Sequence, residues 1–367
     1  MSKLLSQGGY GCVYYPGISC DGSPMTNEKK VVTKIQSDQE WTQREIAVGN
    51  KIINIANFLW YFSPVIESCP IQLTKIDSNL LKNCEVIKKG DINYMVMMVP
   101  YINSSSFLKT LFKEYNHNIL LQLFEINKHI ITSIKLLIDI NVVHLDIKAE
   151  NILFDSVKKN PILIDFGIAI DITTLNKNTF PDIHKTFFYG YHPDYPLWCL
   201  EIQFINYILN KKTDYNETLN YDDIQKVCEE CILQHARFVK VFSRNFIDNY
   251  CKEAIKYYEQ YIGKTYQTFI HEIIELSWKT WDIYSFALVN LHIYSFLFEK
   301  GFFKNDLLNS VFESDIISLH YDPTKRYDIN TKIYNINSNK FFKNNSMKEA
   351  FQLIHNINII SENINYH

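Results

Sequence analysis

The stretch that decides the fold is residues 144–167, which read HLDIKAENILFDSVKKNPILIDFG. Two short apolar runs, ILF and ILI, flank a polar segment, a pattern typical of two buried strands joined by a tight turn. Because such a hairpin returns the chain to its starting point, we expect Asp146, Asn151 and Asp165 to lie close together. Carboxylate and amide oxygens suit Mg²⁺, and an ammonium such as that of Lys148 binds phosphate as a point charge. The stretch therefore predicts a site for magnesium and phosphate.

The composition of the 367-residue chain excludes several classes of protein. Its 47% of hydrophobic residues can build a large core, and its length suits two domains or one unit with two lobes. A formal net charge of -3 gives no electrostatic case for nucleic acid or an anionic membrane as a partner. The most apolar stretch, residues 283–298, is too short to span a membrane and contains Asn290 and His292. We expect a buried helix there and no membrane span.

The eight cysteines are scattered along the chain, and no secretory signal precedes them. We therefore expect reduced thiols and a cytoplasmic location. Cys228 and Cys231 are spaced C-x-x-C, which also fits half of a zinc site, and His235 and Cys251 could supply further ligands. No second C-x-x-C is present in the sequence, so buried free cysteines on one helix face are the favoured interpretation.

The chain begins with a pattern that predicts strands around a glycine-rich turn. Gly8 and Gly11 lack a Cβ, so the turn between them could let backbone amides approach a phosphate, although an ordinary hairpin turn is the alternative. Residues 31–35 alternate as a strand does, and Lys34 within them is either a solvent-facing lysine or a buried phosphate ligand.

A helix and a buried strand follow. Residues 39–56 show helical periodicity, with Glu45 beside the apolar face. The continuous apolar run at 94–99 predicts a buried strand that ends at Pro100. Residues 101–106 are small and polar, as expected for a hinge between two lobes.

The rest of the chain has mainly helical patterns, with a long irregular segment at 168–200. Ser346 and Glu349 form a capping box ahead of a last apolar helix. Further helices are predicted at 119–140, about 201–275 and 278–298, and an Asn-rich loop at 328–345.

Taken in order, the motifs of this chain resemble those of a eukaryotic-type protein kinase over nearly its whole length. They are S-x-G-x-x-G-x-V from Ser6 to Val13, VVTK ending at Lys34, Glu45 on a helix, HLDIKAEN, DFG, WDIYSF at 281–286 and DPTKR at 322–326. The forms GGYGCVYYPG and WCLEI are most similar to kinases of the nucleocytoplasmic large DNA viruses.

The resemblance implies an α+β, bilobal protein-kinase-like fold. The N-lobe, residues 1–100, would be β-rich, and the C-lobe, residues 101–367, would be mainly α-helical with a helical insertion at about 205–275. Together the two lobes would form one kinase domain.

The resemblance also implies the chemistry: an ATP- and Mg²⁺-dependent kinase that transfers the γ-phosphate to serine or threonine hydroxyls of protein substrates. Asp146 would accept the hydroxyl proton and Lys148 would steady the γ-phosphate, while Asn151 and Asp165 would hold Mg²⁺. Lys148 favours serine/threonine over tyrosine as the acceptor. A viral kinase would act in the host cytoplasm or be packaged in the virion.

ATP would bind the N-lobe, with Lys34 bridging the α- and β-phosphates and an ion pair with Glu45 holding the lysine. Glu40 is the alternative partner on the same helix, but the apolar residues that follow Glu45 favour the latter. Val13 would pack on the adenine. The residues expected to cover the phosphates are Ser6, Gly8, Gly9, Tyr10 and Gly11.

Two structural roles carry over from the same resemblance: Asp282 would anchor the catalytic-loop backbone, and Glu201 would pair with Arg326. One departure bears on regulation, because Leu145 replaces the arginine that usually receives an activation-loop phosphate. We hypothesise that activity does not depend on such a phosphate.

Two other classes of function fit the sequence less well. A catalytically dead scaffold predicts loss of Lys34, Asp146, Asn151 or Asp165, yet all four are present. A small-molecule phosphotransferase on a related fold usually lacks DFG and the loop lysine, which this chain has.

Overall fold

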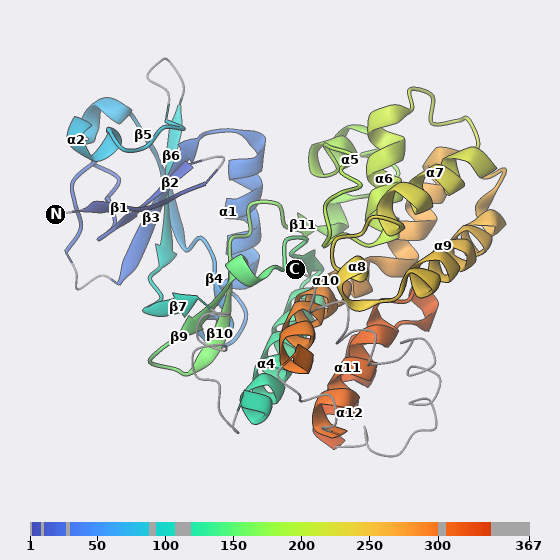
Figure 1. Cartoon of the computed structure of the whole chain (residues 1–367). Helices are drawn as coiled ribbons and strands as arrows, with labels where there is room; N and C mark the ends of the chain where they lie inside the picture. The colour runs from blue at the N-terminus through green and yellow to red at the C-terminus, as the bar shows by residue number, and fades with distance from the viewer. Residues whose placement is uncertain are drawn as a thin grey trace. The chain divides into compact units, whose positions relative to one another are not determined.

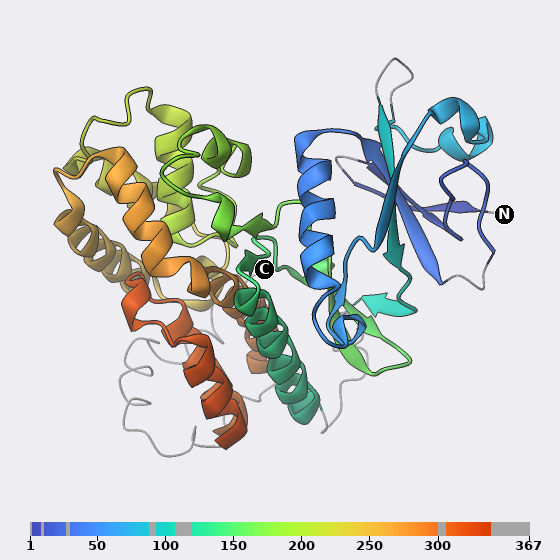
Figure 2. The same ribbon diagram turned by 180° about the vertical axis from the view of Figure 1, so that it is seen from behind.

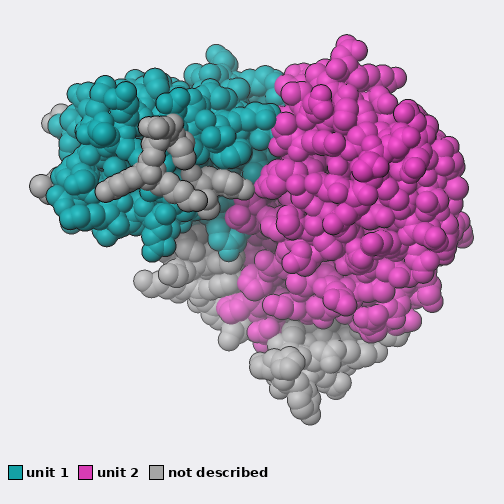
Figure 3. Space-filling model, turned by 90° about the horizontal axis from the view of Figure 1, so that it is seen from above, with its two compact units in different colours: residues 1–115, 139–144, 149–171 teal, residues 116–138, 145–148, 172–367 magenta. Residues whose placement is uncertain are grey.

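The computed structural model describes residues 2–8, 11–26, 30–87, 93–106, 119–299 and 306–338. The chain divides into two compact units, which Figure 3 colours separately. Unit 1 comprises residues 1–115, 139–144 and 149–171, and unit 2 comprises residues 116–138, 145–148 and 172–367. Unit 1 is built on β-sheets and unit 2 is mainly helical, so the predicted α+β class is confirmed.

A five-stranded antiparallel sheet in the order β1-β2-β3-β6-β5 is the main element of unit 1 (Figure 1). Successive side chains of β6, which lies between β3 and β5, point to opposite faces, so Val96 packs in one hydrophobic cluster and Met97 in another. Because both faces are covered, this apolar strand is buried, as predicted. The strands are β1 (Lys3–Gln7), β2 (Gly11–Tyr15), β3 (Val31–Ser37), β6 (Tyr94–Pro100) and β5 (Glu67–Ile71).

Helix α1 (Glu40–Ile52) confirms the helix predicted at 39–56 and ends four residues earlier than expected. Its residue Ile46 packs against the cluster that contains Met97. In the pairing of β3 with β6, Lys34 lies opposite Met97. Since paired residues share a face of the sheet, the side chain of Lys34 lies on the face that α1 covers.

The predicted hairpin at the centre of the sequence is present in unit 1. Strand β9 (Ile152–Asp155) pairs antiparallel with β10 (Asn160–Ile164). The Asp155 side chain closes the turn by accepting hydrogen bonds from the backbone N–H groups of Val157 at 2.8 Å and Lys158 at 3.1 Å. The turn residue Lys159 has a φ of 60°, in the left-handed region that tight turns require.

Two details of the segment around residue 100 differ from the prediction. Strand β6 includes Pro100, which lies opposite Val31 at the end of the pairing. The expected hinge at 101–106 contains strand β7 (Ser104–Ser106), which pairs with β9 in a second sheet beside β10 and β4 (Phe62–Ser63). The small polar residues of this segment do not predict a strand. The strand is defined by its backbone pairing with β9, about 50 residues along the chain.

Unit 2 is organised around α10 (Tyr266–Glu299), a single helix of 34 residues that packs against α6, α8, α11 and α12 (Figures 1 and 2). The expected division between two helices at 275–278 is therefore wrong, because apolar and aromatic side chains bury this helix on both sides of that point. The other elements of the unit are α4 (Ile119–Asp139), α5 (Asp182–Phe187), α6 (Leu200–Lys211), α7 (Tyr221–Ile232), α8 (Phe238–Val241), α9 (Arg244–Tyr258), α11 (Asp306–Ser318) and α12 (Ile329–Ser338).

Helix α12 corrects the loop predicted at 328–345 over residues 329–338, and residues 339–345 lie outside the described part of the chain. The Asp328 side chain accepts hydrogen bonds from the backbone N–H groups of Asn330 at 2.9 Å and Thr331 at 3.0 Å. An N-terminal cap of this kind offsets the low helix propensity of an Asn-rich segment. The helix predicted from Ser346 lies outside the described residues. Among the described residues, no helix is long and apolar enough to cross a membrane.

Four of the eight cysteines form disulfides in unit 1, so the prediction of reduced thiols is wrong for them. Cys12 of β2 is bonded to Cys84, and Cys20 is bonded to Cys69 of β5, with Cα atoms 6.0 and 5.9 Å apart. The sequence spacing could not reveal these pairs because the partners are 72 and 49 residues apart. The cytoplasmic location predicted from reduced thiols loses that support.

A buried ion pair between Arg326 and Glu201 is present in unit 2, as predicted. One Nη of Arg326 donates to Glu201 Oε1 at 2.7 Å, and the two side chains are 1% and 0% exposed. The guanidinium also donates to the carbonyl of His320 at 2.7 Å and to Oγ1 of Thr280 at 3.0 Å. The pair thus joins the start of α6 to α10 and to the segment before α12.

Replacing Arg326 by Ala is expected to lower the free energy of unfolding by about 3–5 kcal/mol, because it leaves the Glu201 carboxylate buried without its partner. Urea denaturation followed by circular dichroism measures this loss. Lys325→Ala is the matched control, since its side chain is 61% exposed and 4.0 Å from Asp322. Equal stability of the two variants would contradict a stabilising role for the buried pair.

Candidate functional site

The ammonium of Lys34 is held by a carboxylate of helix α1 in unit 1. Lys34 Nζ donates to Glu45 Oε1 at 2.9 Å and to Oε2 at 2.8 Å. Glu45 is 4% exposed, whereas Glu40, at the first residue of the helix, is exposed. The predicted ion pair is therefore present, with Glu45 as the partner. Lys34 lies on the covered face of the sheet and is not the solvent-facing lysine of the alternative interpretation.

Asp165 belongs to the same cluster of charges. Its Oδ1 lies 3.3 Å from Lys34 Nζ, and its side chain is 49% exposed. The backbone there is unusual for a non-glycine residue, with a φ of 63°. Phe166 beside it is buried and packs on His144 and Phe62 at ring-centroid distances of 4.8 and 6.1 Å. This anchor holds Asp165 in its left-handed conformation, facing the lysine.

The charges of the cluster shift one another's proton affinities. Burial raises the pKa of Glu45, with Lys34 opposing the shift. Burial alone would lower the pKa of Lys34, but the carboxylates of Glu45 and Asp165 outweigh it and raise that pKa. Desolvation acts to raise the pKa of Asp165, yet the Lys34 ammonium holds it below its usual value. Lys34 therefore stays cationic and Asp165 stays anionic near neutral pH.

The glycine-rich turn connects β1 to β2, and Val13 of β2 lies opposite Lys34 in the pairing of β2 with β3. Ser6 lies opposite Val13 in the pairing of the two strands, and the N–H of Gly8 donates to the carbonyl of Gly11 at 3.0 Å. A Cβ on Gly11 would lie 2.4 Å from the carbonyl oxygen of Ile35, so only glycine allows β2 to approach β3 this closely. Gly9 and Tyr10 lie outside the described residues.

Both ends of the HLDIKAEN motif, residues 144 and 149–151, belong to unit 1. Asn151 ends a short 3-10 helix (Ala149–Asn151), is 5% exposed and leads directly into β9. The ring of His144 contacts the carbonyl oxygen of Ile164 through Nε2 at 3.1 Å. This contact ties the start of the motif to Ile164, the last residue of β10 and the neighbour of Asp165.

Asp146 and Lys148 belong to unit 2 and contact each other directly. Lys148 Nζ donates to Asp146 Oδ2 at 2.7 Å, and the Asp146 side chain is 12% exposed. The hydroxyl of Tyr195 donates to the other oxygen, Oδ1, at 2.5 Å. The sequence does not predict this contact of Tyr195, because no local pattern connects it to a residue 49 positions earlier.

The backbone of Leu145, next to Asp146, is fixed on both sides. Its φ of 62° lies in the left-handed region, which costs a residue with a large side chain on the order of 1–3 kcal/mol. The N–H of Leu145 donates to Asp282 Oδ1 at 2.9 Å, and its carbonyl accepts from Trp198 Nε1 at 3.0 Å. The predicted anchoring of the catalytic-loop backbone by Asp282 is confirmed.

The cysteines of the predicted insertion are buried free thiols, as favoured by the sequence. Cys228 and Cys231 lie on α7 and Cys251 lies on α9. Burial raises the pKa of Cys228 well above its usual value and that of Cys231 to about 12, which disfavours the thiolates that bind zinc. Within the part of the chain that the structure describes, no three His, Cys, Asp or Glu side chains form a group that could hold a metal ion.

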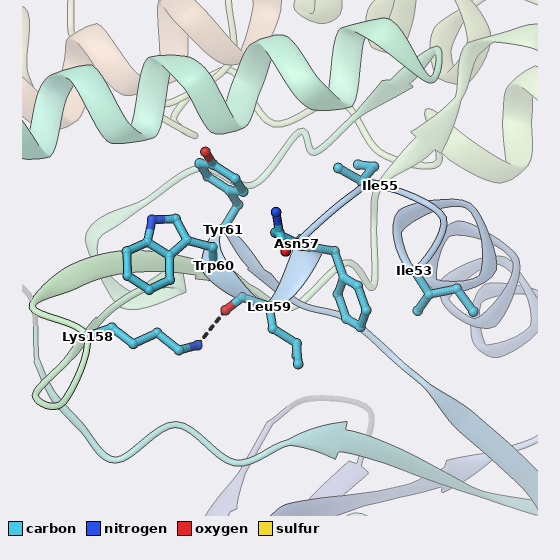
Figure 4. A pocket seen from close by; sticks show the side chains of 8 residues that line it. Ile53, Ile55, Asn57, Leu59, Trp60, Tyr61 and Lys158 are labelled. Atoms are coloured by element: carbon cyan, nitrogen blue, oxygen red, sulfur yellow. Dashed lines mark hydrogen bonds between the residues drawn. The ribbon is translucent and has the colours of Figure 1, made fainter.

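A hollow on the surface of unit 1 is made by the residues that follow α1 (Figure 4). Leu59 and Trp60 there are 44% and 46% exposed, and Lys158 Nζ donates to the carbonyl of Leu59 at 2.6 Å. None of the predicted site residues lines it, so the hollow is separate from the charged cluster. Its lining residues are Ile53, Ile55, Asn57, Phe58, Leu59, Trp60, Tyr61 and Lys158.

Unit 1 brings together the ammonium of Lys34 and the carboxylates of Glu45 and Asp165, and the glycine-rich turn precedes them in the sequence. An ammonium can bind phosphate and a carboxylate can bind a metal ion. The family model described as protein kinase domain matches residues 1–190, just over half of the chain, so the chain belongs to the protein kinase domain family. No curated protein matches the chain. The matched residues include Lys34, Asp146 and Asp165, and family membership makes the protein a phosphotransferase.

Proposed function

We propose that the protein is an ATP- and Mg²⁺-dependent serine/threonine protein kinase. The observation that carries the proposal is the ion pair of Lys34 with Glu45, 2.8 Å long and next to Asp165, in a member of the kinase family. A lysine fixed in this way presents a positive charge that does not need to be reorganised when phosphate arrives. Lys34 would contact the α- and β-phosphates, and Glu45 would position it.

Asp165 and Asn151 would hold Mg²⁺ in this proposal. The Asp165 carboxylate fits that role because it is half-exposed and anionic, and because Gly167 leaves space beside it. A Cβ on Gly167 would lie 3.3 Å from Asp165 Oδ1. Bound Mg²⁺ would neutralise phosphate charge. The turn of Ser6, Gly8, Gly9, Tyr10 and Gly11 would cover the phosphates, and Val13 would pack on the adenine.

Asp146 would act as the base for the acceptor hydroxyl, and Lys148 would contact the transferred phosphate. Lys148, which donates to Asp146 Oδ2 at 2.7 Å, supports a serine or threonine acceptor, because kinases of the family that this chain resembles have a lysine at this point when they have that specificity. The similarity of GGYGCVYYPG and WCLEI to kinases of large DNA viruses supports a viral origin, with action in the host cytoplasm or packaging in the virion.

Side chains that need no phosphate anchor the segment before α6, which supports activity without activation-loop phosphorylation. The Tyr191 hydroxyl donates to Glu230 of α7 at 2.7 Å, and Gln203 Nε2 donates to the carbonyl of His192 at 2.8 Å. The contact with Glu230 also gives the helical insertion a structural role, because it joins α7 to this segment.

The test is transfer of labelled γ-phosphate from Mg²⁺-ATP to dephosphorylated casein, followed by identification of the phosphorylated amino acid. We expect phosphoserine or phosphothreonine, loss of transfer in Lys34→Met and in Asp165→Asn, and no loss after phosphatase treatment of the enzyme. Phosphotyrosine alone would contradict the proposed specificity. Transfer that Asp165→Asn retains with Mg²⁺ would overturn the metal assignment, and no transfer by the wild type would favour a scaffold.

A further inference from the structure

The hydroxyl of Tyr195 is hydrogen-bonded to one of the two carboxylate oxygens of Asp146, the proposed base. It donates to Asp146 Oδ1 at 2.5 Å, while Lys148 Nζ donates to Oδ2 at 2.7 Å. Hydrogen bonds from a hydroxyl to a carboxylate at this distance are among the stronger ones in proteins. If Asp146 is the base of the proposed kinase, the hydroxyl of an incoming acceptor needs the kind of contact that Tyr195 already makes.

The rest of the Tyr195 side chain is fixed to the same loop through an aromatic neighbour. The rings of Tyr195 and Trp198 are 4.7 Å apart between centroids and tilted by 57°. Trp198 in turn donates from Nε1 to the carbonyl of Leu145 at 3.0 Å. The Tyr195 hydroxyl is therefore aimed at Asp146 by packing and is not a freely rotating surface phenol.

The backbone on either side of Tyr195 is anchored independently of its hydroxyl. The carbonyl of His192 accepts from the N–H of Tyr195 at 3.0 Å and from Gln203 Nε2 at 2.8 Å. After the tyrosine, the carbonyl of Leu197 accepts from Ser285 Oγ at 2.7 Å. Because both flanks are held, the phenol can leave Asp146 by side-chain rotation while the segment keeps its place.

We propose that Tyr195 determines which acceptors reach the base: its hydroxyl holds the acceptor position at Asp146 until the hydroxyl of a protein substrate displaces it. This inference rests on the proposed function. Water makes no further contacts that offset the lost hydrogen bond, whereas a protein substrate contacts the enzyme beyond its hydroxyl. Tyr195 therefore selects protein hydroxyls over water as the recipient of the phosphate.

The test compares the wild-type full chain with Tyr195→Phe, which keeps the ring and removes the hydroxyl. Tyr189→Phe is the matched control, because Tyr189 lies in the same segment and is 52% exposed. We expect Tyr195→Phe to raise ATP hydrolysis without an acceptor about tenfold, a change of ~1.4 kcal/mol in the barrier. We also expect a several-fold lower KM for dephosphorylated casein, and no change in KM for ATP or in the control variant.

A role limited to positioning the base predicts a different result: lower kcat for casein and for water, with both KM values unchanged. That result, or unchanged hydrolysis in Tyr195→Phe, would overturn the inference while the wild type still phosphorylates casein. Tyr195→Leu, which also lacks the hydroxyl, must shift hydrolysis in the same direction. Inactivity of both the wild type and Tyr195→Phe would refute the proposed function itself.

Discussion

Asp146→Asn is expected to lower phosphate transfer to casein by roughly 10²–10⁴-fold, the range that a general base contributes. Asn has the same shape as Asp, and its carbonyl can still accept a hydrogen bond from Lys148 or Tyr195. The variant therefore removes the charge and the proton acceptor and keeps the packing of this buried position. The kcat for casein measures the loss.

Binding of the nucleotide should survive this change, because Lys34, Glu45 and Asp165 belong to unit 1. The affinity for a fluorescent ATP analogue, measured in parallel, is expected to stay within a factor of about two. Asp194→Asn is the control, since Asp194 is exposed in the segment that contains Tyr195. A kcat within threefold of the wild type in Asp146→Asn would rule out Asp146 as the base.

Breaking the disulfides of unit 1 is expected to lower the free energy of unfolding strongly. In the chain-entropy model, a loop of 72 residues closed by Cys12–Cys84 and one of 49 residues closed by Cys20–Cys69 each contribute about 4 kcal/mol to stability. We expect removal of one bond to cost about that much and removal of both to cost more. Because the loops overlap in sequence, the total should be less than the sum.

A double-mutant cycle distinguishes a disulfide between Cys12 and Cys84 from two independent buried thiols. If the bond forms, Cys12→Ala, Cys84→Ala and the double variant lose similar stability in denaturant unfolding, because each removes the same cross-link. Additive losses would instead show independent thiols. Cys251→Ala is the control for burial alone, since Cys251 is free and 3% exposed. A reducing agent should destabilise the wild type more than the double variant, because the double variant lacks this bond.

Much of the candidate site was predictable because each of its parts has a local pattern. The hairpin of β9 and β10 follows from two apolar runs and the turn that Asp155 closes. The helix with Glu45 follows from its periodicity, and the order of the motifs identified the family. The partner of Lys34 was predictable as well, because the helical position of Glu45 places it on the buried side of α1.

The errors fall where the deciding contacts are distant in sequence or purely in the backbone. Strand β7 is defined by its pairing with β9, and helix α12 by the cap of Asp328, neither of which composition reveals. The cysteines were predicted to be reduced because spacing does not show which thiols the sheet brings together.

The sequence by itself determined which side chains this protein has for phosphate chemistry and on which elements they lie. Periodicity and turn chemistry act over a few residues, so a chain read in order can reveal them. Only the tertiary structure decided the pairing of Cys12 with Cys84 and the contact of Tyr195 with Asp146. Such contacts depend on how distant segments pack, and packing energy is shared among many residues that no single motif records.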